Sequence, residues 1–121
     1  MYDGLDFSER REHPRVGVAM PVSYRGIRQS GDSAMNAITR DISRGGIRLL
    51  VDEFISVFTR LVVDISIPST VKPVRVVSKV AWVRKRPHGD QYEVGMQFID
   101  IPEEDRRGIF EFVDKSNRKP R

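Results

Sequence analysis

The chain of 121 residues contains no cysteine and only two histidines. The lack of cysteine excludes disulfide bonds and thiolate metal sites. His13 and His88 each stand next to a proline and lie far apart in the sequence, so we expect no metal site. No apolar run approaches the length of a membrane-spanning helix. The first residues also lack the basic and apolar regions of a signal peptide, which favours a cytoplasmic protein.

The composition is that of a soluble globular protein, with 39% hydrophobic and 31% charged residues. This length suits one compact domain with a modest core. The net charge is +4, and the positive residues are clustered. The clusters are Arg10/Arg11/Arg15, Arg40/Arg44/Arg48, Arg84/Lys85/Arg86 and Lys115/Arg118/Lys119/Arg121. Such a balance favours anionic partners, whether nucleotides, nucleic acids or acidic membranes, without choosing among them.

Apolar residues alternate with polar ones through most of the chain, which predicts half-buried β-strands. The expected strands cover residues 16–24, 37–42, 47–51, 61–67, 74–82 and 92–98. Pro21 lies inside the first of these and predicts an edge position or a bulge there. Several short strands separated by turns indicate a closed antiparallel barrel or a sandwich.

The last part of the chain changes to a helical period. Residues 100–103 carry cap, proline and acidic first-turn signals, with Asp100 or Ile101 as the cap. An apolar stripe follows at Ile109, Phe110, Phe112 and Val113, so we expect this helix to plug the barrel or to pack on its side. We divide the chain into a flexible leader (1–15), a barrel with its helix (16–115) and a basic tail (116–121).

Two short polar motifs stand out from this pattern. Arg11 and Arg15 are four residues apart just before the first expected strand, and Asp41-x-Ser43-x-x-Gly46 lies between the second and third. The arginine spacing alone is weak, because Arg40 and Arg44 repeat it. The second motif, taken alone, is equally typical of an ordinary turn capped by Asp and Ser, with Gly at positive φ.

Taken together, the motifs resemble the signature of the PilZ domain family, RxxxR followed by (D/N)xSxxG. The resemblance covers roughly residues 8–114 and includes later landmarks at Ala81-Trp82-Val83 and Gly95-Met96-Gln97-Phe98. It implies a mainly β fold, a six-stranded antiparallel β-barrel with a C-terminal α-helix. That fold agrees with the barrel that the alternation predicts.

The resemblance also implies a ligand, the bacterial messenger cyclic di-GMP. Arg11 and Arg15 would clamp phosphates and guanine edges, since a guanidinium can bind either bidentately. Asp41 would accept hydrogen bonds from guanine N1–H and N2–H, and Ser43 would offer its hydroxyl. Gly46 would permit a close backbone approach that a Cβ blocks. Trp82 lies either beside the ligand or in the barrel core.

Arg10 immediately precedes the arginine motif. In the PilZ family an arginine there is associated with two intercalated cyclic di-GMP molecules, so two molecules per chain are expected. We also expect ligand binding to order the leader and to present a new surface to a downstream protein.

Two other interpretations remain. One is a basic barrel that binds single-stranded nucleic acid, which needs exposed aromatics in a charged groove. Tyr24, Trp82, Tyr92 and Phe98 instead have apolar neighbours and indicate a core, so nucleic acid is a weaker candidate. The other is an adaptor of the same fold that binds no nucleotide. No nucleophile is paired with a base in the sequence, so an enzyme is not expected.

Overall fold

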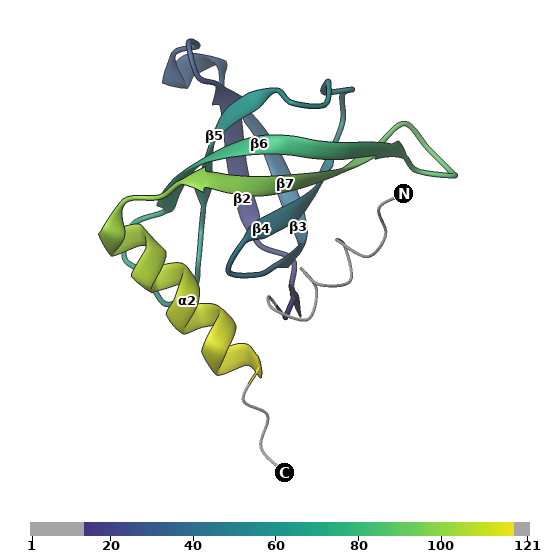
Figure 1. The fold of residues 1–121 in the computed structure, drawn as a ribbon. Coiled ribbons are helices and arrows are strands. Elements are labelled where there is room, and N and C mark those ends of the chain that lie inside the picture. The colour runs from purple at the N-terminus through teal and green to yellow at the C-terminus, as the bar shows by residue number, and fades with distance from the viewer. Residues whose placement is uncertain (1–13, 118–121) are drawn as a thin grey trace.

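A computed structural model describes residues 14–117, and its architecture is a β-barrel followed by a helix (Figure 1). The strands are β1 (Val16–Gly17), β2 (Pro21–Gly26), β3 (Met35–Ile42), β4 (Gly46–Val51), β5 (Arg60–Ile65), β6 (Val74–Lys85) and β7 (Tyr92–Asp100). A short 3-10 turn, η1 (Gly31–Ser33), precedes β3, and the helix α2 spans Glu103–Asn117. The helix therefore continues past the boundary at residue 115 that the sequence suggested.

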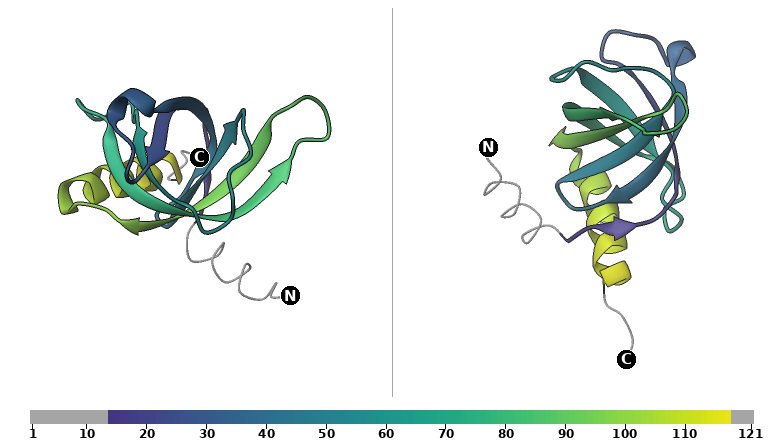
Figure 2. Two further views of the ribbon diagram at one scale, coloured as in Figure 1. Left: turned by 90° about the horizontal axis from the view of Figure 1, so that it is seen from above. Right: turned by 90° about the vertical axis from the view of Figure 1, so that its right-hand side faces the viewer.

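The sheet closes on itself. Its strands follow the order β1-β3-β2-β5-β6-β7-β4, and an additional pairing of β3 with β4 joins the two sides. All the pairings are antiparallel. The predicted six-stranded antiparallel barrel is thus confirmed, with β1 as an extra strand paired to the end of β3 (Figure 2).

The core follows from the alternation of side chains along the strands. In β4, Ile47, Leu49 and Val51 are buried, and in β5 the same is true of Leu61, Val63 and Ile65. The intervening residues of these strands are more exposed and face outward. The inward-facing side chains of these strands therefore form the barrel core, and the outward-facing side chains are available for binding.

The first predicted strand is interrupted, and Pro21 explains why. Proline has no N–H to continue a ladder, and β2 begins at this residue. Between β1 and β2, backbone bonds from Val18 to Arg40 and from Thr39 to Met20 continue the contact with β3, and the side chain of Thr39 adds two more. Its hydroxyl accepts from the Met20 N–H at 2.9 Å and donates to the Val18 carbonyl. The strand thus bends at Pro21 while its polar backbone groups remain satisfied.

The helix lies outside the barrel, against one end of it (Figures 1 and 2). Its contacts are with β6 and β1, so it packs on the barrel and does not plug it. Ile109 and Val113 are buried in this contact. Phe110 and Phe112 of the predicted stripe are only partly buried against the core. Within residues 14–117, no helix is both long and apolar enough to span a membrane.

Candidate functional site

The Asp-Ser-Gly motif forms the turn between β3 and β4, and Ser43 holds that turn together. The buried Ser43 hydroxyl accepts from the N–H groups of Gly45 and Gly46, both at 3.2 Å. The Ser43 N–H donates to the Gly46 carbonyl at 2.9 Å. The serine therefore has a structural role in the turn, and its predicted contact with a base or phosphate stays a prediction.

Gly46 allows two strands to approach closely. A Cβ at this position would lie 2.4 Å from the carbonyl oxygen of Met96 on β7, far inside contact distance. The close approach that the sequence predicted is thus present, but it is made by the protein's own backbone. The backbone of Gly46 does not adopt a positive φ, so the turn does not depend on a left-handed glycine there.

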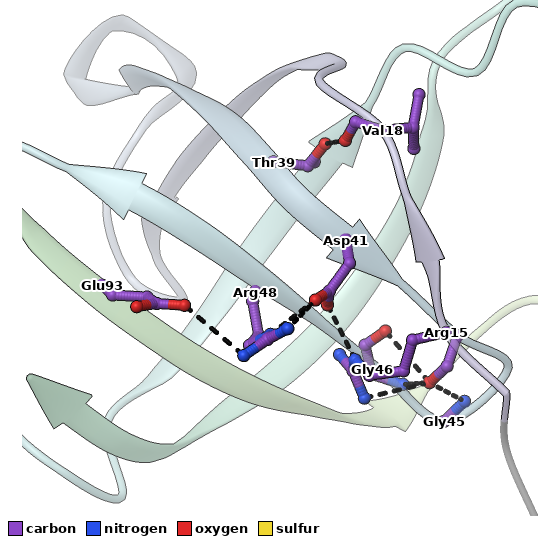
Figure 3. A network of polar contacts seen from close by, with 9 residues as sticks. Arg15, Val18, Thr39, Asp41, Gly45, Gly46, Arg48 and Glu93 are labelled. Carbon is purple, nitrogen blue, oxygen red and sulfur yellow. Dashed lines mark hydrogen bonds and ion pairs between the residues drawn. The ribbon is translucent and has the colours of Figure 1, made fainter. Parts of the chain in front are cut away.

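Asp41 is the centre of the site. It is only 5% exposed, and its two carboxylate oxygens are bound by different arginines. Arg15 Nε donates to Oδ1 at 2.7 Å, and Arg48 Nε donates to Oδ2 at 2.6 Å (Figure 3). Burial alone would raise the pKa of the Asp41 carboxyl, but hydrogen bonds from Arg48 and Arg15 outweigh it and hold the pKa below its usual value. The carboxylate is therefore charged and oriented at neutral pH.

Arg48 connects Asp41 to a second buried carboxylate. Its Nη1 lies 3.5 Å from Glu93 on β7, which is 5% exposed. Glu93 also accepts from Arg84 of β6 at 3.0 Å. The hydrogen bond to Asp41 is the main cause that raises the pKa of Arg48. A chain of alternating charge, Arg15–Asp41–Arg48–Glu93–Arg84, thus crosses the outer face of the barrel, with arginines at both ends. Figure 3 shows it from Arg15 to Glu93.

Trp82 belongs to the same outer face. The strand register aligns Asp41 with Arg48, Arg48 with Gly95, and Gly95 with Trp82. The indole lies directly on Gly95, where a Cβ would come within 2.2 Å of the ring. The Arg84 guanidinium is 5.3 Å from the ring centroid. The interpretation of Trp82 as a core residue is therefore wrong.

A β-bulge explains the orientation of Trp82. The register of β6 on β7 shifts between Val80 and Trp82. Val80 remains buried, but after the bulge it is Val83 that packs against the core. A bulge inserts one residue into a strand and so exchanges the two faces beyond it. The alternation read from the sequence did not include this step.

The structure brings Arg15, Asp41 and Ser43 of the two motifs together, with Arg15 Nη1 at 3.5 Å from the Ser43 hydroxyl. Arg15, assigned to the flexible leader, is thus held at the barrel in the structure. Arg10 and Arg11 lie outside the described residues, as do the rest of the leader up to residue 13 and the end of the tail from residue 118. The predicted roles of Arg10 and Arg11 and the leader boundary stay predictions.

Sequence reasoning missed Arg48 and Glu93. Arg48 could have been found from the turn, because a hairpin that pairs Ile42 with Ile47 also pairs Asp41 with Arg48. Glu93 required the pairing of β7 with its neighbours, for which the sequence holds no comparable signal. Both residues belong to the site because Arg48 holds the Asp41 carboxylate charged and oriented, and Glu93 contacts Arg48.

Next to this site, the turn is also bound to the helix. Arg44 Nη2 donates to Asp114 at 2.7 Å, and its guanidinium lies 4.3 Å from the centre of the Phe110 ring. An open cavity of about 390 Å³ lies between the N-terminal segment, the turn and the end of α2. Its lining residues are Pro14, Arg44, Val113, Asp114 and Asn117. Pro14, next to Arg15, thus lies beside a hollow in which a ligand has room.

The chemistry of the site is that of anion and base recognition. Partly exposed guanidiniums from Arg15, Arg48 and Arg84 share one face with a buried carboxylate and an aromatic ring. Guanidiniums can bind phosphates or purine edges, and a carboxylate can accept from a purine N–H edge. Among residues 14–117, no cluster of three or more acidic or histidine side chains could hold a metal ion.

Comparison with known proteins agrees with the fold. A model described as the PilZ domain matches residues 9–115. The inhibitor of motility MotI/DgrA of Bacillus subtilis is similar in structure, with a TM-score of 0.72 and 16% identity over 91% of this chain and 53% of that protein. The PilZ domain of YcgR from Escherichia coli with c-di-GMP gives a TM-score of 0.67 and 13% identity, covering 90% of this chain and 92% of the domain.

A third similar structure is the MrkH–c-di-GMP complex of K. pneumonia, with a TM-score of 0.59 and 20% identity over 88% of this chain and 50% of MrkH. This chain therefore spans about half the length of MotI/DgrA and of MrkH. None of the curated proteins compared with the chain matches it significantly.

Proposed function

The chain belongs to the PilZ domain family, and on that premise we propose that it is a non-enzymatic receptor for cyclic di-GMP that acts in the cytoplasm. The observation that carries this proposal is the contact between the two motifs, Arg15 Nε to Asp41 Oδ1 at 2.7 Å. Residues from distant parts of the chain are thus side by side, a guanidinium that would bind a phosphate and a carboxylate that would accept from guanine. YcgR and MrkH, which share this fold, have structures with c-di-GMP.

Binding requires an exchange of partners at Asp41. A guanine that donates its N1–H and N2–H to this carboxylate competes with Arg15, which occupies Oδ1. Arg15 then turns to the ligand, where its guanidinium can bind a phosphate or the O6 and N7 edge of guanine. Arg48 keeps its contact with Oδ2 throughout, so the buried carboxylate is never left without a cation. Arg48 is therefore a positioning residue in this scheme.

The arginine segment, residues 8–15, closes over the ligand. Arg11 supplies a second clamp, and Arg10 stacks on guanine and admits a second ligand molecule. Arg15 is already held by Asp41, so the cost of ordering falls on the residues of this segment that precede it. Ordering costs about 1–2 kcal/mol per residue, which offsets much of the gross binding free energy. We therefore expect an affinity that responds to physiological changes in ligand concentration, and a new surface that a downstream protein recognises.

Trp82 forms the far side of the ligand surface. Its indole lies on the outer face, in the same cross-strand row as Asp41 and Arg48. Three strand spacings of about 4.8 Å separate Trp82 from Asp41, a distance of about 14 Å. A ligand that contacts both Asp41 and Trp82 must span this distance along the outer face.

Isothermal titration with cyclic di-GMP tests the receptor function, with cyclic di-AMP as the specificity control. We expect binding near two molecules per chain, and near one if Arg10 does not contribute. Arg15→Ala and Asp41→Ala should each weaken binding about tenfold to a hundredfold, because each good bidentate contact contributes about 1–3 kcal/mol. Arg75→Ala is the matched control, since Arg75 also pairs with an aspartate, Asp64, but near the start of β6, at the opposite end of that strand from Trp82 and Arg84.

The outcomes separate the candidates. If high concentrations of cyclic di-GMP produce no binding heat and no change in melting temperature, the receptor function is refuted. The remaining interpretation is then an adaptor of the same fold. Salt-dependent binding of oligonucleotides in place of cyclic di-GMP would indicate a nucleic-acid binder. Amide exchange in residues 8–15 that saturating ligand leaves unchanged would contradict the closing of the arginine segment.

A further inference from the structure

The loop between β4 and β5, residues 52–59, is firmly attached to the barrel. Its anchors are three side chains and the backbone near its end. Asp52 accepts from Gln91 at 3.1 Å, and Glu53 accepts from Tyr24 at 2.7 Å. Ile55 is buried. The Phe58 N–H donates to the Val80 carbonyl at 2.8 Å. A loop held at so many points presents its outer side chains in a defined arrangement.

Those outer side chains are large and apolar. Phe54 is 61% exposed, Val57 41% and Phe58 72%. Phe54 has a partner, since it packs edge-on against Tyr92 with the ring centroids 5.8 Å apart. Phe58 has no such aromatic partner among the described residues. Large apolar side chains exposed on one firmly held loop indicate a candidate surface for binding another molecule.

Phe58 is also strained. Its φ is 76°, in the left-handed region, and no other non-glycine residue between 14 and 117 has a positive φ. For a bulky residue this conformation costs about 1–3 kcal/mol, and it persists only where the surrounding contacts impose it. Folding would favour Asn or Gly here, because they tolerate positive φ. A strained and exposed phenylalanine thus does not stabilise the fold, and this points to a role in binding.

The rim of this surface is positively charged. Lys79 Nζ lies 5.8 Å from the centre of the Phe58 ring, and Arg60 is paired with Lys79 in the strand register. Neither forms an ion pair with a carboxylate of residues 14–117. An apolar centre with unneutralised cations at its edge complements an acidic segment that carries an apolar side chain.

This surface lies beside the nucleotide site. Gly46 pairs with Gln97, and Gln97 pairs with Lys79, so Lys79 is two strands away from the Asp-Ser-Gly turn. At about 4.8 Å per strand that is about 10 Å, well within one protein interface of about 800 Å² per partner. A partner seated on Phe58 would therefore also touch a closed arginine segment.

We propose that Val57, Phe58, Arg60 and Lys79 form a docking surface for an acidic segment of a partner protein, with Phe58 as its apolar anchor. A second copy of this chain fits less well. A symmetric pairing through the same surface would place Lys79 and Arg60 opposite or beside their own equivalents. The coupling of this docking to cyclic di-GMP rests on the proposed function, whereas the docking itself does not.

The test uses the full chain and a short fluorescein-labelled peptide in which two leucines are flanked by glutamates. Control peptides carry serines in place of the leucines or lysines in place of the glutamates. Fluorescence anisotropy should show binding of the glutamate–leucine peptide only. Phe58→Asn should weaken that binding about tenfold or more, as expected for an aromatic anchor, without lowering the melting temperature. Lys79→Glu should weaken it about twofold to fivefold.

Val71→Ser is the matched control. Val71 is fully exposed in the loop between β5 and β6, at the opposite end of these strands from the Arg60–Lys79 pair, about 17 Å away along the strand. This variant should bind the peptide as the wild type does. Unchanged binding in Phe58→Asn, equal binding of the lysine peptide, or no binding of any peptide would overturn the proposal.

Two further outcomes also decide against it. A melting temperature that falls in Phe58→Asn would mean that the phenylalanine serves the fold. A wild-type dimer that Phe58→Asn dissociates, measured by sedimentation, would mean that the occupant is a second copy. The peptide assay is run with and without cyclic di-GMP. A chain that binds the peptide but not the nucleotide refutes the proposed function and leaves the docking surface intact.

Discussion

Arg48→Ala is the substitution that tests the charged network most directly. The Arg48 guanidinium contacts both buried carboxylates, Asp41 at 2.6 Å and Glu93 at 3.5 Å. After its removal each carboxylate keeps one cation, Arg15 for Asp41 and Arg84 for Glu93. The network should therefore weaken without leaving an unpaired buried charge, and the protein should still fold.

The expected loss can be worked from these contacts. A hydrogen bond to a charged group contributes about 1.5–3 kcal/mol. The contact with Asp41 is short, but the Arg48 side chain is 35% exposed, so solvent screening reduces its contribution. The longer contact with Glu93 adds little. We expect a loss of about 2 kcal/mol in the free energy of unfolding, which lowers the melting temperature by about 8 °C for a domain of this size.

Urea unfolding at neutral pH measures this loss, with Arg75→Ala as the control. Arg75 binds Asp64 bidentately at 2.8 and 3.1 Å, but its side chain is 58% exposed. An exposed pair contributes less than about 1 kcal/mol, despite its good geometry. Equal losses in the two variants, with unchanged dependence on urea, would refute the argument that the buried carboxylates make the Arg48 contacts important.

Three further results are expected. The folded-state pKa of Asp41 is lowered, so its charge stabilises the fold above its unfolded pKa of about 3.9. The difference in the free energy of unfolding between wild type and Asp41→Asn should be complete at pH 7. Acid unfolding should show that this difference disappears as the pH falls below about 4. Gly46→Ala should lower the free energy of unfolding by about 2 kcal/mol or more in urea titrations, because its Cβ would meet the Met96 carbonyl at 2.4 Å. Gly95→Ala should displace the indole of Trp82, the chain's one tryptophan, and so shift the fluorescence emission; an unchanged spectrum would contradict the stacking.

The barrel was predictable because its strands alternate regularly. Ile47, Leu49 and Val51 alternate with polar or half-exposed residues, and one buried face per strand indicates a barrel or a sandwich. The resemblance to the PilZ signature favoured the barrel. The helix was equally clear from Ile109 and Val113. What the alternation could not predict was where a strand breaks or bulges. Pro21 split one strand in two, and the bulge before Trp82 exchanged the faces of another.

The site was predictable only in part, and the reason is similar. The motifs named Arg15, Asp41 and Ser43, which the fold does bring together. They did not name Arg48 or Glu93, because neither is distinguished by its neighbours in the sequence. Their importance comes from their places across the barrel, next to Asp41 and to each other. The Asp41–Arg48 contact follows from the β3–β4 hairpin, but the Arg48–Glu93 contact depends on the pairing of β4 and β7, which a local pattern does not encode.

The turn built by Ser43 and Gly46 has a consequence for the evolution of such chains. Ser43 holds the turn closed, and Gly46 lets β4 reach the Met96 carbonyl, so natural selection for folding alone would keep both residues. A descendant that lost its arginines, and with them any nucleotide, would still carry half of its ancestor's signature. In genome surveys, the serine and glycine would therefore trace the ancestry of the barrel, while Arg15 and Asp41, on the proposed function, would record nucleotide binding.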